Sequence, residues 1–121
     1  MTDMAAILHT FFSGFGIPDY VENTVPDDAT FPYITHQVVQ PEWRGSAPFY
    51  ARVWYRSLSV GGLCAKVDEI ANAIGEGISV PTDDGAVYIY KDTMFVQFMP
   101  FEGDDMLKTA YLSMVIHTPT T

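Results

Sequence analysis

The fold expected for this chain depends most on one stretch of sequence, Ala47-Pro48-Phe49-Tyr50-Ala51-Arg52-Val53-Trp54-Tyr55-Arg56-Ser57. Aromatic and β-branched residues dominate it, which predicts a β-strand, and side chains of a strand alternate between two faces. One face therefore carries Phe49, Ala51, Val53 and Tyr55, and the other carries Tyr50, Arg52, Trp54 and Arg56. Pro48 lacks an amide hydrogen, which places it near the strand start or at a sheet edge.

Two segments on either side of this strand have helical periodicity. In residues 3–15 the apolar residues recur at helical spacing, with Thr2 as a candidate N-cap. In residues 59–75 an apolar stripe of the same kind ends at Gly75. The two stripes consist of Met4, Ile7, Leu8, Phe11, Phe12 and Phe15, and of Leu63, Val67, Ile70 and Ile74.

Most of the remaining chain is expected to form strands: 33–40, 78–80, 86–91, 94–99 and 107–118, the last being the longest. Asp92-Thr93 is expected to make a two-residue hairpin. The proline-rich segment 17–32 is expected to be a long loop, either packed as a surface connection or reaching a neighbour. These elements predict a single α+β domain over residues 1–121, a mostly antiparallel β-sheet with two α-helices packed on one face.

Composition limits the classes of function. The chain has 121 residues, 48% of them apolar, and 15 acidic against 6 basic residues give a net charge of −9. An acidic domain is poorly suited to gripping nucleic-acid phosphates. The single cysteine, Cys64, excludes an intramolecular disulfide. No signal-peptide pattern and no apolar run near the ~20 residues of a membrane span are present, so a soluble, cytoplasmic protein is expected.

No motif for chemistry stands out. His9, His36 and His117 fall on separate elements without metal-ligand spacing. The acidic turns Asp83-Asp84-Gly85 and Asp104-Asp105 do not match a calcium loop. No phosphate-binding loop is expected, because neither Gly14-Phe15-Gly16 nor Gly61-Gly62 has the required pattern. No serine has the flanking glycines of a nucleophile elbow. We therefore expect no catalytic, cofactor-binding or metal-binding residues and no enzyme activity.

The expected sheet has a surplus of apolar side chains. Two helices cover one face, and the other face would carry Tyr50, Trp54, Tyr111 and Val115. Monomers rarely expose a large apolar patch, so this face is expected to meet another subunit unless the 17–32 loop covers it. Arg52 and Arg56 could then reach a neighbour's acidic turns, and Trp54 could equally be a core residue. The candidate interface residues are Trp43, Arg44, Tyr50, Arg52, Trp54 and Arg56.

Three short segments carry a resemblance to a known family. They are Phe31-Pro32-Tyr33-Ile34-Thr35, Val53-Trp54-Tyr55-Arg56-Ser57 and Ala65-Lys66-Val67-Asp68-Glu69-Ile70. In this order, and over nearly all 121 residues, the chain resembles the small tail-terminator or tail-completion proteins of long-tailed bacteriophages and prophages. The resemblance implies an α+β fold and a non-enzymatic role in virion assembly.

The resemblance also implies partners and a location. Such proteins form a homo-oligomeric ring, commonly a hexamer, that caps the tail tube and joins it to the head through head-completion or connector proteins. DNA passes through the ring without specific binding, which an acidic subunit suits because like charges repel. The expected location is the virion tail, assembled in the host bacterial cytoplasm, with no membrane and no cofactor. The alternatives are a head-completion or minor capsid protein and, less favoured, a small-ligand-binding α+β domain.

Overall fold

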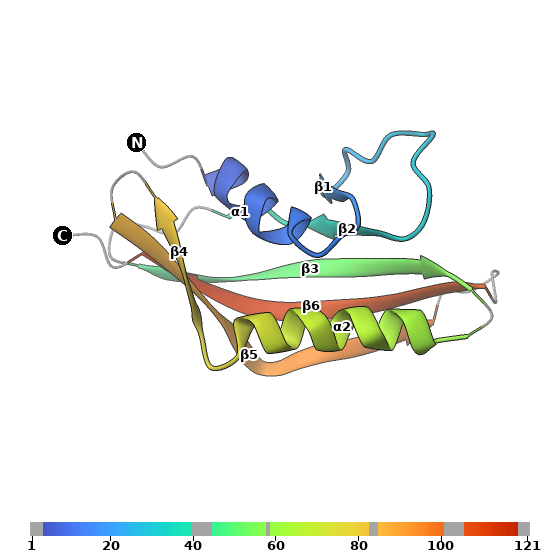
Figure 1. The fold of residues 1–121 in the computed structure, drawn as a ribbon. Helices are drawn as coiled ribbons and strands as arrows, with labels where there is room; N and C mark the ends of the chain where they lie inside the picture. The colour runs from blue at the N-terminus through green and yellow to red at the C-terminus, as the bar shows by residue number, and fades with distance from the viewer. Residues whose placement is uncertain (1–3, 40–44, 58, 83–84, 101–105, 119–121) are drawn as a thin grey trace.

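The computed structural model describes residues 4–39, 45–57, 59–82, 85–100 and 106–118 (Figure 1). Within them six strands form one sheet in the order β1-β2-β3-β6-β5-β4, in which only the β1–β2 pair is parallel. The elements are α1 (Met4–Ser13), β1 (Asp19–Val21), β2 (Tyr33–His36), β3 (Ser46–Arg56), α2 (Gly61–Ile74), β4 (Ile78–Thr82), β5 (Gly85–Pro100) and β6 (Leu107–His117). The expected α+β class with a mostly antiparallel sheet is confirmed.

The centre of the sheet is the long antiparallel pair β3–β6. Its register runs without interruption from Ser46 opposite His117 to Arg56 opposite Leu107. Both strands alternate as their sequences predict, so Ala51 faces the core opposite Leu112 while Arg52 and Tyr111 share the other face. The last of the described strands, β6, therefore lies inside the sheet, between β3 and β5.

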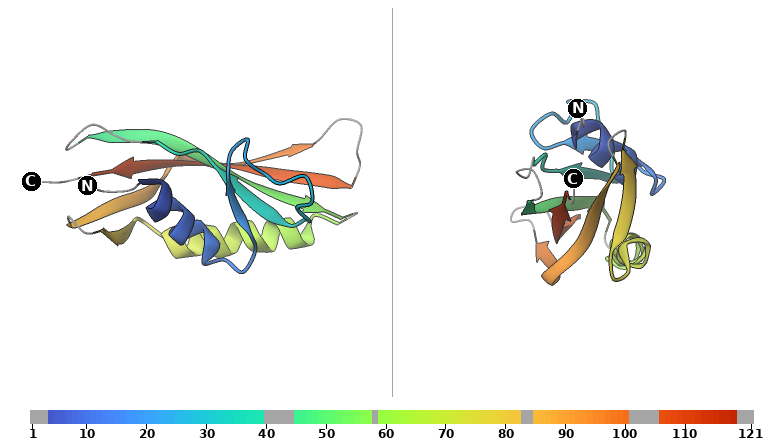
Figure 2. Two further views of the ribbon diagram at one scale, coloured as in Figure 1. Left: turned by 90° about the horizontal axis from the view of Figure 1, so that it is seen from above. Right: turned by 90° about the vertical axis from the view of Figure 1, so that its left-hand side faces the viewer.

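Both helices lie on the same side of the sheet (Figure 2). The apolar stripes of α1 and α2 pack into one core with the inward residues of the strands. The largest fully buried side chains of this core are Leu8, Phe12, Ile34, Val53, Leu63, Ile70, Ile74, Ile89, Leu112, Met114 and Ile116. The expectation of two helices on one face is confirmed, and burial of these side chains is the main source of stability.

The predicted hairpin at Asp92-Thr93 is wrong. β5 runs through this point as one strand of 16 residues, which makes it longer than the 11-residue β6. Its register against β6 shifts between Lys91 and Val96, and the Thr93 backbone N–H donates to the Asp92 carboxylate at 2.8 Å. A two-residue hairpin favours a residue that tolerates positive φ, usually glycine, and without one the extra residues form an irregularity in a continuous strand.

Smaller differences concern element ends. The 17–32 segment contains β1, a three-residue strand whose Asp19 pairs with Ile34 of β2. β2 ends at His36, before the expected Gln40, which is outside the described residues, as is Thr2. β4 continues through Pro81, which an edge strand tolerates. Among the described helices, none has the length and apolar character that crossing a membrane requires.

Candidate functional site: the outer groove

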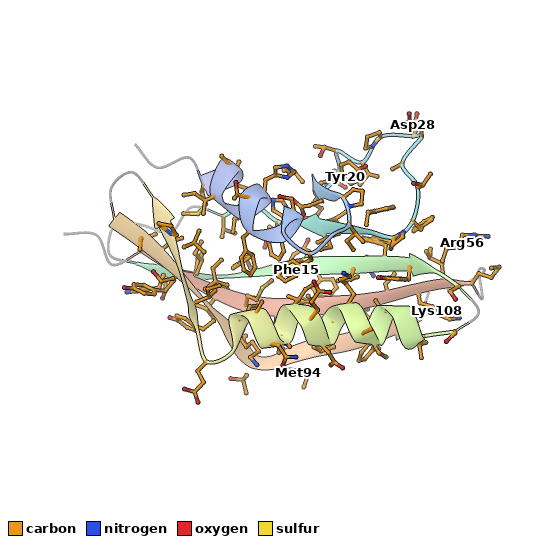
Figure 3. The ribbon with its side chains drawn as sticks, in the orientation of Figure 1. Phe15, Tyr20, Asp28, Arg56, Met94 and Lys108 are labelled. Carbon is orange, nitrogen blue, oxygen red and sulfur yellow. The ribbon has the colours of Figure 1, made fainter. Side chains whose placement is uncertain are left out.

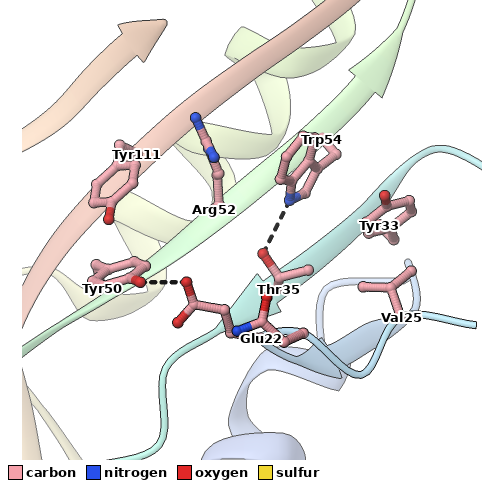
Figure 4. Close-up of a pocket in the computed structure, with 9 residues that line it drawn as sticks. Glu22, Val25, Tyr33, Thr35, Tyr50, Arg52, Trp54 and Tyr111 are labelled. Carbon is pink, nitrogen blue, oxygen red and sulfur yellow. Dashed lines mark hydrogen bonds between the residues drawn. The ribbon is translucent and has the colours of Figure 1, made fainter.

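The sheet face opposite the helices, here called the outer face, has a hollow of about 420 Å³. This outer groove lies over β2, β3 and β6, and the segment that follows β1 forms its rim (Figure 4). Its lining residues are Glu22, Asn23, Val25, Tyr33, Thr35, Tyr50, Arg52, Trp54 and Tyr111. The 17–32 segment therefore covers part of the face, as one alternative expected, while most lining side chains stay partly exposed.

Stacked aromatic rings form the walls of the groove. Tyr33 and Trp54 are cross-strand partners in the β2–β3 register, and their rings stack with centroids 6.0 Å apart. On the other side, Tyr50 and Tyr111 stack at 4.6 Å. Phe31 extends the first stack, 5.0 Å from Tyr33. Cross-strand aromatic pairs of this kind add to sheet stability and hold the rings in fixed positions.

Arg52 lies between the two stacks. Its guanidinium carbon is 4.7 Å from the centre of the Trp54 ring and 5.4 Å from that of Tyr111, so it makes cation–π contacts on two sides. Its Nε is buried and has no hydrogen-bond partner. Among the described residues no carboxylate forms an ion pair with it.

The groove's own carboxylate is engaged elsewhere. Glu22 accepts a hydrogen bond from the hydroxyl of Tyr50. This hydrogen bond, followed by burial and the neighbouring Tyr111, raises the pKa of Tyr50 well above its usual range. Burial, with a smaller effect of Tyr20, also raises the pKa of Tyr33. Both phenols are therefore neutral near pH 7, and the charges of the groove are those of Arg52 and Glu22.

The candidate interface residues are only partly brought together. Tyr50, Arg52 and Trp54 line the groove, and Trp54 donates its indole N–H to Thr35 Oγ1 at 3.0 Å instead of entering the core. Arg56 is exposed at the end of β3, outside the groove lining (Figure 3). Trp43 and Arg44 lie outside the described residues.

The sequence interpretation missed several groove residues as site residues. Strand alternation had placed Tyr111 on this face, and its register opposite Arg52 could not be read locally. Tyr33 and Thr35 follow from the same alternation in β2. Glu22 reaches the groove only through the path of the chain after β1, for which the sequence has no signal.

A second polar cluster lies inside the molecule and was not expected. Asp19 is fully buried and contacts two histidines, His36 Nδ1 at 2.7 Å and His9 Nδ1 at 2.9 Å. His36 is also fully buried and stacks on Phe12, with ring centroids 5.2 Å apart. This cluster joins α1 to β1 and β2. Within the described residues, no group of His, Cys, Asp and Glu side chains is arranged to hold a metal ion.

Chemically, the outer groove combines one cation, aromatic walls and a rim carboxylate. Such a composition is typical of surfaces that bind another molecule, because aromatic residues and arginine are enriched where interfaces concentrate binding energy. No protein-family model matches the sequence. No curated protein matches it either. The function is therefore inferred from the surfaces of the chain.

Proposed function

We propose that the chain is a non-enzymatic assembly protein that resembles phage tail terminators and forms a homo-oligomeric ring that caps a tail tube and joins it to the head. The observation that supports this most is a pair of surfaces that its own helices leave uncovered. One is the outer groove on β2, β3 and β6. The other is the distal part of β5, where Met94 is 61% and Phe98 is 53% exposed.

The distal part of β5 has the features of a docking surface. β4 pairs with β5 only up to Ile89, so from Lys91 onward the described residues provide a partner strand on one side alone, β6. Unpaired strand edges readily accept another chain. Beside this edge Phe98 lines an apolar hollow of about 270 Å³ with Val60 and Leu63 at the start of α2. Met94 points away from the body of the molecule (Figure 3).

Two different surfaces are what a ring needs. A ring forms from a head-to-tail interface, in which one patch of each subunit meets a different patch of the next. The outer groove and the distal part of β5 are on different strands of the same sheet. A net charge of −9 on each copy also favours a ring lumen that does not hold DNA.

Native mass spectrometry and sedimentation test the proposal. We expect a closed species that is a multiple of 13.5 kDa, formed by the chain alone or on adding a tail tube protein encoded in the same genome. Phe98→Asp should prevent it, while Ala73→Asp, which adds the same charge at an exposed position of α2, should not. A wild-type chain that stays monomeric under both conditions would contradict the proposal. Capture of a head connector instead of the tube would indicate a head-completion protein.

One observation favours a second candidate function, a small-ligand-binding domain. The outer groove brings Arg52 and Glu22 together between aromatic walls, which are features of ligand sites. This candidate predicts that a small molecule copurifies or binds in the groove while the chain remains a monomer. Sedimentation of the chain before and after removal of any bound small molecule separates the two candidates, because only the ligand-binding candidate predicts a monomer in both states.

A further inference from the structure

We infer that the outer groove binds a carboxylate presented by a second copy of this chain, with Arg52 as the residue that receives it. This inference rests on the proposed self-assembly and adds the chemistry of the contact. Apolar surfaces favour association but do not specify which groups must meet, whereas a contact between Arg52 and a carboxylate does.

The first support is the way in which Arg52 is held. Trp54 and Tyr111 contact the guanidinium at 4.7 and 5.4 Å from its central carbon to their ring centres. Ring contacts of this kind occupy the faces of a guanidinium and leave hydrogen bonding to its N–H groups, which lie in its plane. A carboxylate is the group that matches this planar set of donors.

The second support is that Arg52 lacks an acceptor within the described chain. Its Nε is buried without a hydrogen-bond partner, and a buried donor without an acceptor is unfavourable. Glu22 accepts a hydrogen bond from Tyr50 and forms no ion pair with Arg52, and the Thr35 hydroxyl oxygen accepts from Trp54. By contrast Lys66, on α2, is paired with Glu69 at 2.9 Å.

The third support is charge. Arg52 is the one cation among the lining residues, and Glu22 adds a negative charge beside it. A singly charged carboxylate is therefore favoured over a doubly charged phosphate. A second copy brings 15 Asp and Glu residues against 6 Lys and Arg, so carboxylates are the most abundant charged groups that it presents. The exposed acidic side chains among the described residues are Asp27, Asp28, Asp68, Glu69, Glu76 and Asp92.

Assembly of single variants provides the main test. Arg52→Gln should weaken ring formation roughly 30-fold or more, because it leaves the incoming carboxylate without its charged partner. Arg52→Lys keeps the charge but not the planar donor set, so an intermediate loss is expected. Lys66→Gln removes the same charge from α2, outside both the groove and the β5 hollow, so it is the matched control and should change assembly by less than about threefold. Far-UV circular dichroism checks that each variant is folded.

A second measurement uses the wild-type chain and a defined probe. The Trp54 indole N–H lies beside Arg52, and its NMR signal is identified with Trp43→Phe, which leaves Trp54 as the single tryptophan. Capped hexaglutamate should shift this signal saturably, and Arg52→Gln should abolish the shift. Capped hexaglutamine is the uncharged control, and inorganic phosphate and succinate test other anions.

The outcomes separate the two proposals. A wild-type chain that never assembles refutes the proposed function and, with it, a second copy as the carboxylate donor. A ring that forms equally well with Arg52→Gln overturns the present inference alone. A Trp54 signal that responds more strongly to phosphate, or to succinate, than to hexaglutamate overturns it as well, because the groove would then select a different anion.

Discussion

Replacing Asp19 with alanine is the change that most directly tests how the buried polar cluster holds α1 to the sheet. A carboxylate only accepts hydrogen bonds, so we assign an Nδ1–H donor to both His36 and His9. The His36 contact, at 2.7 Å, joins two side chains without solvent exposure. The His9 contact, at 2.9 Å, involves a side chain that is 56% exposed.

The expected magnitude follows from this difference in burial. Without Asp19, the buried Nδ1–H of His36 has lost its acceptor, and the Nε2 of the same ring already lacks a hydrogen-bond partner. A buried donor without a partner costs about 1–3 kcal/mol, and a hydrogen bond to a charged group contributes about as much. We expect Asp19→Ala to lower the free energy of unfolding by about 3 kcal/mol. His9→Ala leaves Asp19 its contact with His36, and the exposed position of His9 lets water reach the other carboxylate oxygen, so this change should cost less than Asp19→Ala.

Urea unfolding followed by far-UV circular dichroism measures both changes at equal protein concentration. With a slope of about 1–2 kcal/mol/M, Asp19→Ala should move the midpoint by about 2 M. The cost arises from leaving His36 without an acceptor, so Asp19→Ala should cost about 2 kcal/mol less in a His36→Leu background. Additive effects in this double-mutant cycle, or an Asp19→Ala cost no larger than that of His9→Ala, would refute the reasoning.

Three further changes test other parts of the structure. Phe12→Ala removes a fully buried ring and should cost about 4 kcal/mol in urea unfolding; a loss under about 1 kcal/mol would argue against the α1 packing. The hydrogen bond to Glu22 raises the pKa of Tyr50 in the folded chain, so the unfolded chain loses this proton first and stability falls above about pH 10. Tyr50→Phe should reduce that alkaline decline, and an unchanged pH profile would contradict it. A Cβ at Gly62 would lie 2.9 Å from the Tyr55 ring, whereas a Cβ at Gly61 would lie 3.3 Å from Ser59 Oγ. Gly62→Ala should therefore lower the thermal midpoint of unfolding more than Gly61→Ala does.

Much of the fold could be predicted because strand and helix periodicities are local. Alternation correctly placed Phe49, Ala51 and Val53 toward the core, and it placed Tyr50, Arg52, Trp54 and Tyr111 on the opposite face, where they line the groove. The two helical stripes predicted which side of each helix is buried. Helix and strand geometry set these patterns within a few residues, whatever the neighbouring chain does.

The errors occurred where a local signal was weak. Asp92-Thr93 has the length and polarity of a turn, yet continuous pairing of β5 with β6 on both sides of the irregularity kept the strand extended. β1 is too short to show a period, and it exists because residues around Pro18 lie beside β2, where the Ile34 backbone N–H donates to the Pro18 carbonyl at 2.8 Å. Neither outcome is encoded within a window of a few residues.

The sequence by itself determined which side chains share a face, because alternation along a strand is a property of the backbone. Only the tertiary structure decided which faces meet: β6 returns beside β3 and puts Tyr111 opposite Arg52, and the chain after β1 brings Glu22 to Tyr50. Asp19 reaches His9 and His36 for the same reason. Contacts between distant segments depend on how the whole chain closes around its core, and no short stretch of residues carries that information.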